Sequence, residues 1–75
     1  MERYKNLGGD SGVVAYELGK DSITVEFNDG SLYLYTYQSA GSNNIEQMKG
    51  LAVTGRGLNT FINKNVRKKY ASKLR

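Results

Sequence analysis

The feature that most constrains this chain is a turn signal, Asn28-Asp29-Gly30, set between two strand-like runs. Residues 23–27, Ile-Thr-Val-Glu-Phe, alternate apolar with polar residues, as a half-buried strand does. A second run extends from Ser31 to Gln38. Because glycine accepts the positive φ that tight hairpin turns demand, this turn signal predicts that the two runs pair as antiparallel strands.

The register of this hairpin decides which side chains are buried. A two-residue loop would place Leu32 and Leu34 on the face of Val25, with the alternating tyrosines on the other side. A three-residue loop ending in a glycine bulge would instead turn the tyrosines toward the core. One residue of slip exchanges the two faces, so both registers stay open at this point.

A further strand is expected before the hairpin. Residues 13–18 have the pattern of a strand, and residues 19–22 have that of a turn. A tight loop there would pair Leu18 with Ile23, Tyr16 with Val25, and Val14 with Phe27 on one face. Residues 1–11 mix charges with glycines and show no periodicity. We therefore expect a flexible N-terminal arm over 1–11 and a single domain over 12–75.

Two helices are expected after the sheet. A linker at 39–42 precedes Asn43, which resembles a capping box with Glu46 three residues later. The first helix should end near Gly55, and its buried side should comprise Ile45, Met48, Leu51 and Ala52. The second helix should bury a stripe of Leu58, Phe61, Ile62 and Val66. The expected fold class is α+β, a three-stranded antiparallel β-meander followed by two α-helices packed on one face.

The end of the second helix leaves two alternatives open. Asn65 and Lys69 fall on the apolar stripe itself. Either the helix leaves the core after about Val66, or these two side chains serve a partner. One interpretation of residues 68–75 is a final helical turn that becomes ordered only on binding.

The residue types present exclude several kinds of chemistry. The 75 residues include no cysteine and no histidine, which removes disulfides, thiol nucleophiles and Cys/His zinc sites. Glu17 and Glu26 fall on one sheet face, but an open sheet of this size lacks the cleft that acid–base catalysis needs. We expect no enzyme activity, cofactor or metal. No run approaches the roughly 20 apolar residues that cross a bilayer or resembles a signal peptide, so the expected location is cytoplasmic.

Charge is divided unevenly along the chain. The net charge is +4, and all seven acidic residues lie within residues 1–46. Residues 47–75 contain no acid and carry the basic residues Lys49, Arg56, Lys64, Arg67, Lys68, Lys69, Lys73 and Arg75. One-sided charge of this kind favours an anionic partner, with a solvated basic tail as the alternative.

Several short motifs occur in an order that matches a known family. They are Ile23-x-Val25-x-Phe27, Gly30, Leu32-Tyr33-x-Tyr35, Gly57-Leu58-Asn59 and Val66-Arg67-x-x-Tyr70, spread over residues 13–70. The set resembles the KTSC domain, a short module found at the C-terminus of some lysyl-tRNA synthetases and as free-standing bacterial and phage proteins. Here Thr60 to Asn65 separate Asn59 from Val66-Arg67, about one helical turn more than in the family pattern. The resemblance implies the meander-and-helices fold and RNA binding, and it favours the register in which Tyr33 and Tyr35 face the core.

Candidate binding residues gather in the second helix and in the tyrosine run. Basic side chains neutralise phosphates, and the glycine turn before the second helix adds backbone N–H groups that favour an anion. The candidate nucleic-acid or anion-binding residues are Arg56, Gly57, Asn59, Lys64, Arg67, Lys68, Lys69, Tyr70 and Lys73. Tyr33, Tyr35 and Tyr37 are candidates for stacking on bases. The structural alternatives are a solvated basic face, a plain glycine turn, an ion pair of Arg67 with Glu17 or Glu26, and tyrosines that belong to the sheet core.

Three functions stay open on this reasoning. The leading hypothesis is a non-catalytic RNA-binding module that uses a basic C-terminal helix. The alternatives are an oligomer that binds a small phosphorylated nucleotide and a phage-type protein-interaction module that docks on an acidic host protein. A homo-oligomer is one way for so short a chain to complete a pocket. Membrane binding is the weakest option, because the basic helix lacks a wide apolar face.

Overall fold

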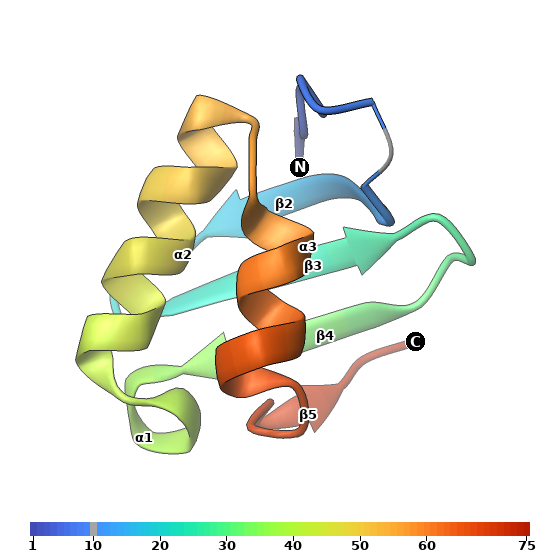
Figure 1. Ribbon diagram of the computed structural model, residues 1–75. Helices are drawn as coiled ribbons and strands as arrows, with labels where there is room; N and C mark the ends of the chain where they lie inside the picture. Colours follow the sequence, from blue (N-terminus) through green and yellow to red (C-terminus); the bar gives the residue numbers. More distant parts are fainter. Residues whose placement is uncertain (10) are drawn as a thin grey trace.

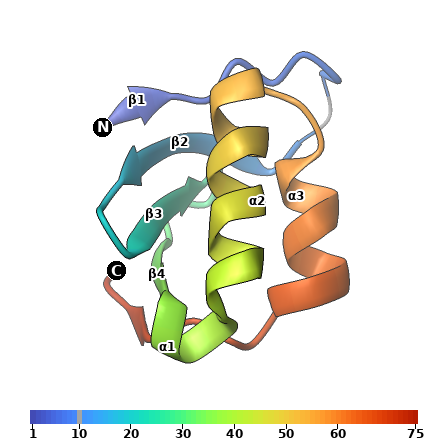
Figure 2. The same ribbon diagram turned by 90° about the vertical axis from the view of Figure 1, so that its left-hand side faces the viewer.

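The computed structural model describes residues 1–9 and 11–75 and has two layers, a sheet and a set of helices (Figure 1). The strands are β1 (Glu2–Arg3), β2 (Val13–Leu18), β3 (Ser22–Phe27), β4 (Leu32–Thr36) and β5 (Ser72–Lys73). The helical elements are α1 (Tyr37–Ala40), α2 (Ser42–Thr54), α3 (Leu58–Phe61) and η1 (Ile62–Val66), a π-helical continuation of α3. All helices lie on one face of the sheet, with α2 and α3 side by side (Figure 2). The predicted α+β class and the meander followed by helices are confirmed.

The sheet is antiparallel and has the strand order β1-β2-β3-β4-β5. Its centre is the predicted meander of three strands, which is widened by one two-residue strand at each edge. Val25 pairs with Tyr33 and Ile23 pairs with Tyr35, so the register that turns these tyrosines toward the helices is confirmed. Gly30 allows this register, because it adopts a φ of +88° and donates its N–H to the carbonyl of Phe27.

The pairing of β2 with β3 follows the prediction at one end and departs from it at the other. Leu18 faces Ile23 as expected, but Val13 faces Phe27 where Val14 was expected. The reason is a register shift between Val13 and Ala15, typical of a β-bulge, which places two residues of one strand against one of the other. The shift buries Val13 and leaves Val14 39% exposed.

The first residues are not the loose arm that their composition suggested. Glu2–Arg3 pairs with β2, and Tyr4 enters the core with 3% of its surface exposed. The backbone N–H of Tyr4 donates to the carbonyl of Val14, 3.0 Å away. The edge of β2 and the open end of the core explain the difference, since both need a partner from elsewhere in the chain. Within the expected arm, Asp10 lies outside the described residues.

Helix α2 buries the predicted side and ends at the predicted place. Ile45, Met48 and Ala52 are buried, and Gly55 ends the helix in the left-handed region with its N–H on the carbonyl of Leu51. The predicted cap at Asn43 is wrong, because α2 begins after Gly41 without a side-chain cap. The capping box belongs instead to the short helix α1, part of which occupies the expected linker. In that box Thr36 and Ser39 each accept a hydrogen bond from the other's backbone N–H.

The second helix leaves the core after Val66, which settles one of the two alternatives. Leu58, Ile62 and Val66 are buried, whereas Asn65 is exposed and donates its side-chain amide to the carbonyl of Phe61. Residues 68–75 do not extend the helix in this structure, so the expected basic C-terminal helix is shorter than predicted. The chain turns back to form β5, where the N–H groups of Ala71 and Leu74 donate to carbonyls of β4. These bonds satisfy an edge that would otherwise be open.

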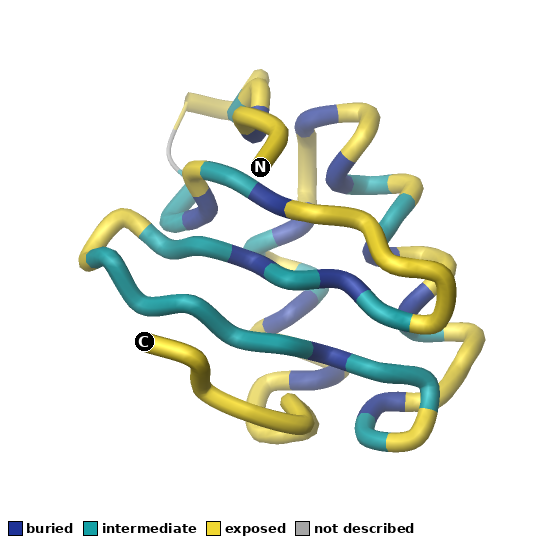
Figure 3. Tube along the Cα trace, turned by 180° about the vertical axis from the view of Figure 1, so that it is seen from behind, coloured by how far each residue is buried: buried dark blue, intermediate teal, exposed yellow. Residues whose placement is uncertain are grey.

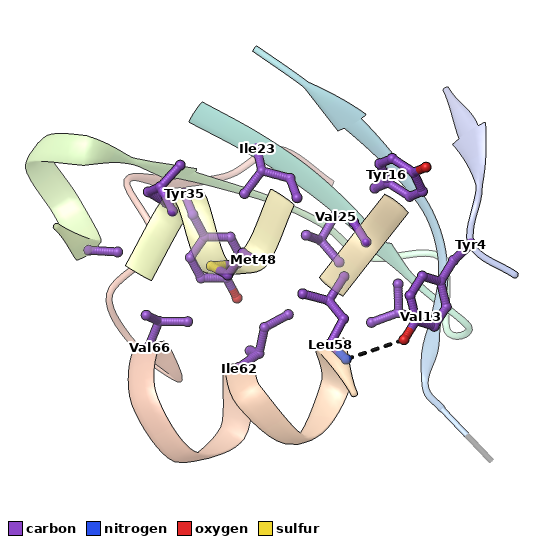
Figure 4. Packing of buried hydrophobic residues seen from close by; sticks show 13 residues of the cluster. Tyr4, Val13, Tyr16, Ile23, Val25, Tyr35, Met48, Leu58, Ile62 and Val66 are labelled. Carbon is purple, nitrogen blue, oxygen red and sulfur yellow. Dashed lines mark hydrogen bonds between the residues drawn. The ribbon is translucent and has the colours of Figure 1, made fainter. Parts of the chain in front are cut away.

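The core lies between the sheet and the helices. Its largest buried side chains are Tyr35, Ile23, Ile45, Met48, Leu58, Val13, Val25 and Val66, and most of them are seen in Figure 4. In the part of the chain that the structure describes, the opposite face of the sheet carries no helix (Figure 3). Among residues 1–9 and 11–75, no helix has both the length and the apolar character needed to cross a bilayer.

Candidate functional site

An open groove lies between η1 and the β3–β4 turn, and we call it the aromatic groove. It has a volume of about 400 Å³ and is lined by Phe27, Asn28, Asp29, Ser31, Tyr33, Tyr35, Ile62, Asn63, Arg67, Lys68 and Tyr70. The end of the sheet that carries the β3–β4 turn extends beyond α3, to the right in Figure 1. The helices therefore leave part of the inner sheet face within reach of a ligand.

Four aromatic rings form the floor of the groove. Tyr33 lies at their centre, with its ring centroid 5.7 Å from that of Phe27 and 4.8 Å from that of Tyr70. Tyr70 also meets the ring of Tyr35 edge-on, at 6.3 Å and 87°. The β3–β4 register supplies three of these rings, and the turn between η1 and β5 brings Tyr70 onto them. Because Tyr70 is 38% exposed, part of its ring surface is open to solvent.

Positive charge borders one side of this floor. Arg67 and Lys68, at the end of η1, are exposed and line the groove. Lys73 on β5 places its Nζ 5.8 Å from the ring centroid of Tyr33, a cation–π distance. Arg67 was expected to have Glu26 or Glu17 as an alternative partner. Glu26 instead pairs with Arg75, at 3.0 Å.

The other border of the groove is polar and includes one carboxylate. Asp29 accepts hydrogen bonds from the backbone N–H and the hydroxyl of Ser31, at 2.9 and 2.6 Å. These bonds lower the pKa of Asp29, so its side chain is a carboxylate at neutral pH. The groove therefore has a positive and a negative border, and an anionic group is favoured on the side of Arg67 and Lys68.

The deepest aromatic residue, Tyr35, is neutral over the whole physiological range. It is 1% exposed, and its hydroxyl points from the sheet toward the helical layer that carries Ile62 and Val66 (Figure 4). Burial raises the pKa of Tyr35 to about 12, with smaller contributions from the neighbouring Tyr33 and Tyr70. Tyr35 thus serves mainly as core, whereas Tyr33 and Tyr70 supply the accessible ring surface.

The glycine turn and Asn59 belong to a different site. Gly57 and Asn59 line a separate polar hollow of about 170 Å³, together with Tyr4, Asn6, Gly8, Ser11 and Thr60. The first N–H of the helix, that of Leu58, donates to the hydroxyl oxygen of Tyr4 at 3.2 Å. That amide, which the sequence suggested for an anion, is already used within the fold. Arg56 is exposed on the turn and does not line the aromatic groove.

The remaining candidate residues also lie outside the groove. Lys64 and Lys69 are exposed and are not among its lining residues. Tyr37 is the first residue of α1, at the far end of β4, and donates its hydroxyl to Glu46 at 2.5 Å. Lys49 lies 3.2 Å from the same carboxylate and 5.8 Å from the Tyr37 ring centroid. The hydrogen bond with Tyr37 is the main cause that lowers the pKa of Glu46, and the same bond raises the pKa of Tyr37.

Six of the eleven groove residues were not predicted from the sequence. The missed lining residues are Phe27, Asn28, Asp29, Ser31, Ile62 and Asn63. For the first four of these, the one available signal was proximity to the Asn-Asp-Gly turn, which the tyrosine register places beside Tyr33. Within residues 1–9 and 11–75, no cluster of three or more metal-ligating side chains is present.

Fold and groove together define a small α+β module with one aromatic groove that is positively charged along one border. No protein-family model, curated protein or solved structure matches the chain.

Proposed function

We propose that this chain is a non-catalytic RNA-binding module that holds unpaired nucleotides in the aromatic groove. The observation that carries the proposal is the juxtaposition of Tyr33 and Tyr70 with Arg67 and Lys68 around one open groove. Aromatic faces take up bases, and guanidinium or ammonium groups take up the phosphates between them.

The arrangement favours single strands over duplexes. Stacking of one base on an aromatic side chain contributes about 1–3 kcal/mol, and it requires a base that is not already stacked in a helix. Every base has such a face, so little sequence preference is expected. The charge distribution supports the same partner, because residues 47–75 contain no acidic side chain.

The resemblance to the KTSC family supports RNA binding as well. Of the motif residues that carry the resemblance, Phe27, Tyr33, Tyr35, Arg67 and Tyr70 all line the groove. Asn59 does not, and the additional helical turn between Asn59 and Arg67 is consistent with that separation. We propose family membership and a bacterial or phage origin on this basis only.

A small phosphorylated nucleotide is a second candidate ligand. A volume of about 400 Å³ lies within the range of ~300–1,000 Å³ that is typical of small-molecule sites. The groove is formed by one chain, so this form of the hypothesis needs no pocket between subunits. Docking on an acidic host protein is the third possibility, which the same measurements separate from RNA binding.

The test is fluorescence anisotropy with labelled single-stranded RNA, a duplex of the same length and a panel of mononucleotides, at about 50 and 200 mM salt. We expect single strands to bind most tightly and to weaken steeply with salt. Saturable binding of mononucleotides alone would support the second candidate. Absence of any RNA binding at the lower salt would refute the proposal, and capture of an acidic protein from nuclease-treated lysate would then favour the third.

A further inference from the structure

Among the described residues, one face of the sheet carries no helix and mixes polar side chains with a few apolar ones, and we call it the outer face (Figure 3). A solvated face of an antiparallel sheet normally carries polar side chains. Because Tyr33 and Tyr35 point inward, alternation turns Leu32 and Leu34 outward. Leu74 follows them on the C-terminal edge and is 52% exposed. Leu32 and Leu34 are half-buried there, without the cover that the described helices give to the inner face.

The charges on the outer face are arranged in a definite order. The strand register places its side chains in two parallel rows. One row runs across the strands through Arg3, Ala15, Glu26 and Leu32, and the other runs through Glu17, Thr24, Leu34 and Ser72. Glu26 is already neutralised by Arg75, at 3.0 Å. The unneutralised groups named in these rows are Arg3 at one edge and Glu17 on the neighbouring strand.

We propose that the outer face is the interface for a second copy of this chain. Two sheets pack face to face with their strands nearly aligned, within about 30°. The two-fold axis would lie in the plane of the interface, parallel to the two rows and midway between them, and so perpendicular to the strands. It would place each row of one chain against the other row of the second copy. Such an interface is self-complementary, as two-fold symmetry requires.

The two rows fit each other under this operation. Leu32 of one chain would face Leu34 of the second copy, and Glu26 would face the hydroxyl of Thr24. Glu17 of the second copy would lie over Ala15, beside Arg3. Two-fold symmetry makes every such contact occur twice. A single orientation of the second copy therefore brings together both the apolar pairs and the opposite charges.

The area of the outer face is adequate for a weak to moderate dimer. The extents of the molecule, 30 × 24 × 22 Å, limit any one face to at most roughly 700 Å². Each partner in a standard interface buries about 800 Å². The aromatic groove lies on the inner side of the sheet, so this dimer leaves both grooves accessible and the proposal does not depend on RNA binding.

The experiment is sedimentation equilibrium of the whole chain over a range of concentrations, with charge-swap variants. We expect a dimer with a Kd of about 10 µM or tighter. Glu17→Arg and Arg3→Glu should each weaken dimerisation roughly tenfold or more, because each places like charges together. The double variant should restore most of the loss. Urea unfolding of each variant shows whether the fold is intact.

A matched apolar pair provides the control. Leu74 on the outer face and Val53 on α2 are 52% and 53% exposed. Leu74→Arg should weaken the dimer roughly tenfold or more, whereas Val53→Arg should leave it unchanged. A wild-type chain that is monomeric at about 100 µM would overturn the proposal. So would a dimer that all outer-face variants leave intact, because its interface would then lie elsewhere.

Discussion

The hydroxyl oxygen of Tyr4 accepts a hydrogen bond from the backbone N–H of Leu58, which lies 54 residues later in the chain and 3.2 Å away. That N–H is the first of the second helix, where no carbonyl of the helix itself is available. The Tyr4 ring is 3% exposed and closes the end of the core (Figure 4). The first residues and the second helix therefore stabilise each other.

Substitution of Tyr4 tests whether the N-terminal segment is part of the fold. Tyr4→Phe should lower the free energy of unfolding by about 1–3 kcal/mol, because it leaves a buried N–H unpaired. Tyr4→Ala should lower it by about 3–5 kcal/mol, because it also leaves a cavity. Leu7→Ala, at a site in the same segment that is 55% exposed, should change it by less than about 0.5 kcal/mol. Urea unfolding measures all three, and a neutral Tyr4→Ala variant would mean that the segment is loose after all.

Two variants in the aromatic groove should separate charge from stacking. Arg67→Gln should reduce the salt dependence of RNA binding, because one phosphate contact is lost. The slope of the logarithm of the binding constant against the logarithm of salt concentration should decrease in magnitude by about one. Tyr70→Ala should cost about 1–3 kcal/mol of affinity and leave the slope unchanged. Lys64→Gln, on the same helix but outside the groove, is the control and should alter both quantities less. Equal effects of Lys64→Gln and Arg67→Gln would indicate diffuse attraction to the basic segment 47–75 as a whole.

Alkaline pH should destabilise the protein through Tyr35. Its pKa is raised from about 10 to about 12 by burial, so the folded state favours the neutral hydroxyl. The resulting stabilisation is fully present below pH 10 and is lost as the pH rises through about 12, since the unfolded chain releases this proton first. Tyr35→Phe should remove this part of the pH dependence, as measured by urea unfolding at several pH values. An unchanged alkaline profile would contradict the burial of Tyr35.

The hydrogen bond between Tyr37 and Glu46 should be visible in an NMR titration of the carboxyl groups. Tyr37→Phe should raise the pKa of Glu46 toward its ordinary value, because the main cause of its lowering is removed. A carboxyl group whose pKa is lowered in the folded state stabilises the fold at pH values above its ordinary pKa. This stabilisation is lost as the pH falls through the folded-state pKa. The stability difference between the two proteins should therefore shrink in acid. Asp29, whose pKa is lowered by Ser31 at the other end of the sheet, is an internal control that should not move.

Two glycines near the end of α2 should respond to alanine in opposite directions. Gly50 lies within the helix, and the space that an added Cβ would occupy there is open, so Gly50→Ala should stabilise by about 0.5–1 kcal/mol. Gly55 has a φ of +88°, and an added Cβ would lie 2.6 Å from the Cβ of Lys5. Gly55→Ala should therefore destabilise by more than about 1 kcal/mol. Thermal unfolding of both variants gives the comparison, and equal effects would argue against the close approach of Lys5.

Local patterns predicted the elements whose period was clear. The alternation around Val25 predicted β3, and the turn at Gly30 was correctly identified as a hairpin. The spacing of Ile45 and Met48 predicted the buried side of α2. The two edge strands were not predicted, because two residues are too few to show a period. Their formation depends on unpaired backbone groups of β2 and β4, which are themselves products of the fold.

The candidate site residues were predicted from composition and motifs, and the structure distributes them over more than one surface. The acid-free segment 47–75 suggested nine residues in one helix and the glycine turn before it, but the chain turns back after Val66 and separates them. Arg67 and Tyr70 reach the groove, whereas Asn59 and Lys64 do not. Residues adjacent in sequence diverge at the end of a helix, so charge density along the chain does not predict which side chains share a surface.

The amino-acid sequence by itself determined the class of fold, the central meander and the absence of cysteine and histidine chemistry. These depend on residue type and on periods of two and about 3.6 residues, which are local properties. Only the tertiary structure decided that Tyr4 completes the core, that Tyr70 lies on Tyr33, and that the outer face of the sheet lacks a helical cover. Each of these depends on contacts between distant parts of the chain, whose geometry is set by how the layers pack.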